Sequence, residues 1–152
     1  MPCYRAHRAK LLIEKEIHML TLLRTLIGLV GLGALIIGAM WWYQPETAAG
    51  LLGASLLDGT GRSAQIGDSG AFFIGVGTLL LWGAVRQRSV FILIGGCLVG
   101  LVAPGRILSA TLHGGAVTTP EVVVECVIFL LALMTWFTIK RQAIERGQSA
   151  RH

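Results

Sequence analysis

The stretch from Thr25 to Tyr43, TLIGLVGLGALIIGAMWWY, contains no charged residue and decides the class of fold. A helix needs roughly 17 to 25 mostly apolar residues to cross the hydrocarbon layer of a bilayer, because each residue adds about 1.5 Å of rise. The run is long enough, and its apolar residues occupy every helical face instead of one stripe. We therefore predict a transmembrane helix over residues 25–43, with its closing Trp-Trp-Tyr cluster at headgroup depth.

Three further apolar runs follow, over residues 69–85, 89–105 and 126–139. The last run reaches spanning length when it begins near Glu121, after Thr119 and Pro120, which are typical of a helix start. The whole chain of 152 residues is 54% hydrophobic and 14% charged, whereas a soluble domain is about a quarter charged. The sequence therefore predicts an all-α fold, an integral membrane four-helix bundle, and disfavours a soluble helical bundle.

The segments between these runs predict how the chain is organised. Residues 44–68 are too long for a simple connector, and we expect a short interfacial helix in this first outer loop, opened by Pro45 and closed at Asp58-Gly59. Residues 86–88 form a tight charged turn. The chain then divides into an amphipathic cytoplasmic or interfacial segment (1–20), a domain of four transmembrane helices (21–140) and a cytoplasmic tail (141–152).

The distribution of basic residues predicts the orientation in the membrane. Four spans place eleven of the thirteen Lys and Arg residues on the side of the two termini and the 86–88 turn. Only Arg62 and Arg106 remain for the other side. Because basic residues near spans are retained in the cytoplasm, both termini are predicted to be cytoplasmic. The net charge of +5 is then a topology signal, and no nucleic-acid partner is expected.

Small residues spaced four apart predict where the helices touch, because they allow close backbone approach in lipid. The pairs are Ala34/Gly38, Ala71/Gly75 and Gly96/Gly100. We expect Gly75, Gly96 and Gly100 to pack against other helices of the same chain. The alternative is a seam between two copies of the protein.

Two ionisable residues are predicted at membrane depth, where such groups are rare enough to mark a site. Arg106 follows Pro104-Gly105 near the outer end of the third span, and Glu125 lies about one turn inside the fourth. Both therefore belong at similar depth, where a guanidinium and a carboxylate offset each other's loss of water. Pro104 removes one backbone hydrogen bond and is expected to bend the helix beside Arg106.

Other polar residues extend this predicted centre toward the outer face. Glu121 lies one helical turn before Glu125, His113 lies in the preceding loop, and Asp68 opens the second span. They could line a pocket for a small molecule or lipid. Two alternatives are a purely structural Arg106–Glu125 clamp and a metal site built from His113, Glu121 and Glu125. No catalytic motif such as a P-loop or H-E-x-x-H is present.

Several of these residues together resemble a known family. They are Gly75-Val-Gly77, the arginine-containing turn, Gly105-Arg106-Ile-Leu-Ser109, the glycine pair that follows, and Glu125. This pattern, over roughly residues 20–140, resembles small four-helix bacterial membrane proteins of the DoxX-like superfamily. The resemblance implies a four-helix bundle in the bacterial inner membrane, and relatives that accompany redox systems.

The functional expectation is a non-catalytic, multi-pass inner-membrane protein. It would serve as an accessory or small-ligand-binding component, with its polar centre at Arg106 and Glu125. Its expected partners are the lipid bilayer and either another membrane protein or a small hydrophobic ligand. One alternative is a quinone-linked redox subunit in which Arg106 holds a quinone carbonyl, although the chain has no paired cysteines or visible cofactor ligand. The other alternative is a small transporter.

Overall fold

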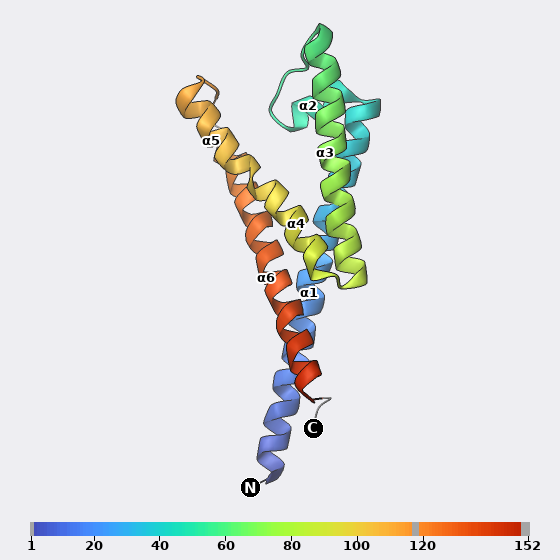
Figure 1. The fold of residues 1–152 in the computed structure, drawn as a ribbon, viewed down its shortest axis with the longest axis vertical. Helices are drawn as coiled ribbons and strands as arrows, with labels where there is room; N and C mark the ends of the chain where they lie inside the picture. The colour runs from blue at the N-terminus through green and yellow to red at the C-terminus, as the bar shows by residue number, and fades with distance from the viewer. Residues whose placement is uncertain (1, 117–118, 150–152) are drawn as a thin grey trace.

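The computed structural model describes the backbone of residues 2–116 and 119–149 and the side chains of residues 14–116 and 119–144. The described residues are helical with connecting turns and contain no strand (Figure 1). The helices are α1 (Pro2–Tyr43), α2 (Pro45–Leu51), α3 (Gly59–Arg86), α4 (Ser89–Gly100), α5 (Val102–Leu112) and α6 (Thr119–Ser149). The predicted all-α class is confirmed.

Within the described part of the chain, four segments are long and apolar enough to cross a membrane: Glu14–Tyr43, Gly59–Arg86, Ser89–Leu112 and Thr119–Ile144. The third consists of α4 and α5, which meet at Leu101. Pro104 lies four residues after Gly100, so its ring excludes the helical hydrogen bond to the Gly100 carbonyl and crowds that group. The chain is therefore a multi-pass membrane protein whose third span is interrupted just before Arg106.

The helices form two pairs. α1 packs along α3, and α6 packs along α4 and then α5, while contacts of α3 with α4 and of α1 with α6 join the pairs. Figure 1 shows the pairs close together near the α3–α4 turn and apart near α2 and α5. α5 contacts α4 and α6 over a small area and has few or no contacts with α1 or α3. The polar residues of α5 therefore lie on a helix supported mainly by α6.

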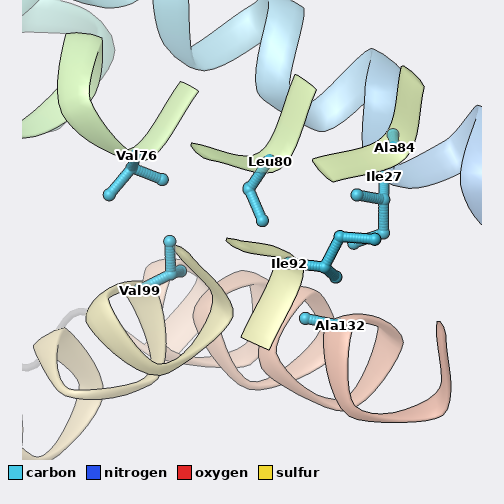
Figure 2. Close-up of a cluster of buried hydrophobic side chains, with 7 residues drawn as sticks. All are labelled: Ile27, Val76, Leu80, Ala84, Ile92, Val99 and Ala132. Atoms are coloured by element: carbon cyan, nitrogen blue, oxygen red, sulfur yellow. The ribbon is translucent and has the colours of Figure 1, made fainter. Parts of the chain in front are cut away.

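The core joins all four spans in the region where the two helix pairs lie close together. Figure 2 shows buried side chains of α1 and α3 facing those of α4 and α6. The cluster consists of Ile27, Val76, Leu80, Ala84, Ile92, Val99 and Ala132. Polar replacement here would leave an unsatisfied group, and large-to-small replacement would open a cavity, so this cluster holds the two pairs together.

A second apolar cluster lies under α2. Trp41, at the end of α1, is 2% exposed and packs against Ala48 and Ala49 of α2. Trp42 and Tyr43 are exposed. Trp41 therefore packs inside the protein because α2 folds back over it, and only Trp42 and Tyr43 of the three aromatic residues are exposed to the surroundings.

The predicted short helix opens at Pro45 but closes earlier than expected. Gly53, with φ +70°, follows α2, and the Ala54 N–H donates to the Ala49 carbonyl at 2.9 Å, a glycine-based helix stop. The pair Asp58-Gly59 begins α3 instead of ending α2, because Asp58 is extended and Arg62 Nε donates back to the Leu57 carbonyl at 3.0 Å. As a result α3 is longer than the apolar run that predicted it.

Glycines set the close approach of α1 and α3. A Cβ atom on Gly77 would stand 2.7 Å from the Gly31 carbonyl oxygen, and one on Gly38 would stand 2.6 Å from the Ile74 side chain. These glycines recur every seven residues, at Gly31 and Gly38 in α1 and at Gly70 and Gly77 in α3. A seven-residue spacing keeps one seam facing a partner helix.

Of the glycines predicted from their four-residue spacing, two contact another helix and one does not. A Cβ on Gly96 would collide with the Ala132 Cβ, and one on Gly100 would stand 2.9 Å from the Phe129 ring, so both lie at the α4–α6 contact. Gly75 has no heavy atom within 4 Å of its Cβ position. The expected contact of Gly75 with another helix of this chain is therefore wrong, because Gly75 lies on the opposite side of α3 from Gly77.

Gly77→Leu should destabilise the protein, whereas Gly75→Leu should not. The added side chain at Gly77 would meet the α1 backbone, and forcing extra atoms into a packed contact costs about 1 to 3 kcal/mol. Thermal unfolding of both variants in the same mild detergent measures the difference. Equal unfolding temperatures for the two variants would contradict the assigned α1–α3 seam.

Candidate functional site

An ion pair links α5 to α6 near the interruption of the third span. Arg106 Nε donates a hydrogen bond to Glu125 Oε1 at 2.7 Å. The side chain of Arg106 is 27% exposed and that of Glu125 is 12% exposed, so the ion pair is mostly buried within the protein. Such a charge-assisted bond is stronger than a neutral one, and it compensates part of the loss of water.

The second carboxylate oxygen of Glu125 is not satisfied. Oε2 is buried and, among the described residues, has no hydrogen-bond partner. An ionised carboxylate offers acceptor positions on both oxygens, and a buried polar atom left without a partner costs about 1 to 3 kcal/mol. A pair that served only to fix two helices would be more stable with this oxygen bonded. Oε2 therefore lacks a hydrogen-bond donor, and neighbouring atoms must move before a ligand can supply one.

The local sequence explains how Arg106 reaches Glu125. The chain ends α4 at Gly100, turns through Leu101 and resumes in α5, which then contacts α6. Glu125 lies in the second turn of α6, after Thr119 and Pro120 have started that helix as predicted. The break before Pro104 and the start of α6 together set the two side chains at one level.

Glu121 lies one turn before Glu125 on α6 and approaches the loop that follows α2. Its Oε1 lies 3.5 Å from the position that a Cβ atom would take on Gly53. The loop after α2 therefore reaches the start of α6. The positive φ of Gly53 favours glycine in that turn, whereas the Glu121 carboxylate lies at an ordinary contact distance from it.

The remaining residues of the predicted pocket are not joined to the pair. His113 ends α5 and Asp68 lies within α3, both exposed, and neither side chain has a hydrogen bond or ion pair among the described residues. No three His, Cys, Asp or Glu side chains in the described part of the chain are placed to hold a metal ion. His113, Glu121 and Glu125 are all described, so this arrangement does not support the metal alternative.

One arginine contact was not predicted from the sequence. Arg24 of α1 donates from Nε to the Ala84 carbonyl at 2.9 Å and from a terminal nitrogen to the Val85 carbonyl at 3.4 Å. These carbonyls belong to the last turn of α3, whose helix dipole favours a cation. From the sequence, Arg24 contributes only to the predicted topology. Its position on the same face as Ile27 was the available clue that it packs against a neighbouring helix.

Comparison with known proteins gives no relative: no family model matches the chain, and neither a curated protein nor a solved structure matches it. The residues themselves therefore carry the functional inference.

Arg106→Leu and Glu125→Leu should each destabilise the protein by about 3 kcal/mol or more, because either change breaks the bond between the two charged side chains in an apolar setting. The double variant should be close to the unsubstituted protein in stability. Denaturant unfolding in detergent micelles measures all four proteins of this cycle. Additive losses in the double variant would show that the two side chains do not act as a pair.

Proposed function

We propose that the protein is a non-catalytic, multi-pass membrane protein that binds a small amphiphilic ligand at the Arg106–Glu125 pair. The observation that carries this proposal is the buried Oε2 of Glu125, which has no hydrogen-bond partner among the described residues. A ligand hydroxyl or N–H group would complete the bonding of that oxygen. The chain would then act as an accessory or binding component of a larger membrane system.

The surroundings favour a ligand with an apolar body. Ile107 and Leu108 follow Arg106 on α5 and are exposed, as are Val123 and Val124 before Glu125 on α6. In a bilayer these side chains face lipid tails or a ligand of similar polarity. Oε2 is buried in this structure, so binding requires side chains on α5 or α6 to rearrange. Of these two helices, α5 has few or no contacts with α1 and α3 that would restrain it.

A purely structural clamp is the competing interpretation of the same pair. It accounts for the bond between Arg106 Nε and Glu125 Oε1. It gives no reason for an unsatisfied Oε2, which weakens a clamp. The binding proposal accounts for both oxygens of the carboxylate.

The redox and transport alternatives each require a different behaviour of Glu125. An oxidised quinone only accepts hydrogen bonds and would leave Oε2 unsatisfied, whereas a quinol hydroxyl could donate to it. A transporter would need Glu125 to change its bonding during each cycle, with flux lost in Glu125→Gln. Quinol is therefore one member of the ligand class proposed here.

The same proposal includes three further points: membership of the DoxX-like superfamily, location in the bacterial inner membrane, and cytoplasmic termini. The sequence pattern around Arg106 and Glu125 supports the first two. The excess of Lys and Arg at the termini and in the 86–88 turn supports the orientation. Arg62 is the exposed exception near the start of α3, and its side chain pairs with Asp58 at 3.5 Å.

Protein purified in mild detergent should retain a small molecule that carries a hydroxyl or N–H group, detectable by mass spectrometry of the organic extract. Glu125→Gln should lower the retained amount about tenfold or more, because the substitution places an N–H donor where Oε2 accepts, and a hydrogen bond to a charged group contributes about 1.5 to 3 kcal/mol.

Glu121→Gln is the matched control, one turn away on the same helix, and should retain the molecule unchanged. The same extract reports any quinol. Equal amounts of each extracted molecule from unsubstituted protein and Glu125→Gln would refute ligand binding at Oε2 and leave the structural clamp.

A further inference from the structure

A groove lies beside the α3–α4 turn, at the opposite end of α3 from the α2 loop (Figure 1). Trp82 and Arg86 of α3, Arg88 of the turn and Phe91 of α4 line it, and its volume is ≈ 590 Å³. The groove is open to the outside. Two arginines and two aromatic rings thus share one accessible hollow, far along the chain from the Arg106–Glu125 pair.

The positive charge of this groove is not neutralised within the described protein. Arg86 and Arg88 are exposed, and neither forms an ion pair with a described residue. The guanidinium of Arg86 lies 4.8 Å from the centre of the Trp82 ring, a cation–π contact that holds it in place while its N–H edges stay accessible.

The location of the groove determines what can enter it. The spans Gly59–Arg86 and Ser89–Leu112 end and begin at this turn, so the groove lies where the hydrocarbon layer meets the headgroups. Trp82 is 49% exposed, and tryptophan favours this depth. Val85 and Val90 are exposed beside the groove. The arginines therefore face headgroups while the neighbouring apolar side chains face acyl chains.

We propose that this groove binds the headgroup phosphate of an anionic phospholipid. The two arginines would donate to the phosphate oxygens, and the first acyl carbons would lie against Trp82 and Phe91. A zwitterionic lipid would bring its own ammonium group against two cations, which lowers its affinity. Free phosphate is disfavoured, because it has no acyl chain to place against Trp82 and Phe91. This proposal is independent of ligand binding at Glu125.

Native mass spectrometry of the full chain in detergent, with equimolar phosphatidylglycerol and phosphatidylcholine, tests the proposal. The unsubstituted protein should retain phosphatidylglycerol about 25-fold more than phosphatidylcholine, since each of the two arginines near anionic lipid adds a factor of about five. The double variant Arg86→Gln/Arg88→Gln should lose this preference. Arg62→Gln, an exposed arginine at the other end of α3, is the matched control and should keep it.

Arg88→Gln alone serves if the double variant does not fold, because the Arg88 side chain has no hydrogen bond or ion pair with a described residue. It should lower the preference about fivefold. Equal retention of the two lipids by unsubstituted protein would overturn the proposal, as would an unchanged preference in the arginine variants. Displacement of phosphatidylglycerol by millimolar inorganic phosphate would overturn it in favour of a free-phosphate site.

Discussion

The structure depends on contact between its outward faces and lipid. Large apolar side chains are exposed along the outer faces of α1 and α6, among them Leu29, Ile36, Leu130 and Phe137. In water these faces would require polar cover or a partner, whereas in a bilayer lipid tails cover them. Because lipid provides no strong hydrophobic force between helices, the helices must associate through close packing. Glycines therefore carry the α1–α3 contact, and Arg106–Glu125 gives α5 a polar link to α6.

The arrangement of the two helix pairs places different chemistry at the two ends of the bundle. Near the α3–α4 turn, the pairs share one core, and Arg24 binds the last carbonyls of α3. Toward α2 and α5 the pairs separate, and the polar contacts there include the Arg106–Glu125 pair, the Arg62–Asp58 pair and the approach of Glu121 to Gly53. A rearrangement that exposes Glu125 Oε2 is thus easiest at the end held by the fewest helix contacts. Rigid packing lies at the end with the basic groove.

The sequence predicted the spans well because the bilayer requires long, uncharged helices, and it predicted Arg106 beside Glu125 because both residues fall at one depth. It did not predict which helix face meets which neighbour. Gly75 and Gly77 differ only in facing opposite sides of α3, a choice that depends on the position of α1. Trp41 is buried because α2 folds back over it, and Glu121 approaches Gly53 because of the loop after α2. Such contacts between distant segments leave little trace in local composition. The seven-residue glycine spacing was a readable signal that four-residue counting overlooked.

Accessibility of two introduced cysteines tests the membrane-spanning arrangement most directly. Ser63→Cys near the start of α3 and Gln87→Cys after its end, each in a chain whose native cysteines are alanine, would be labelled in intact cells by a membrane-impermeant thiol reagent. We predict labelling of Ser63→Cys from outside, and labelling of Gln87→Cys only after the membrane is permeabilised. Labelling of both positions from outside would show that α3 does not cross the bilayer and would contradict the account.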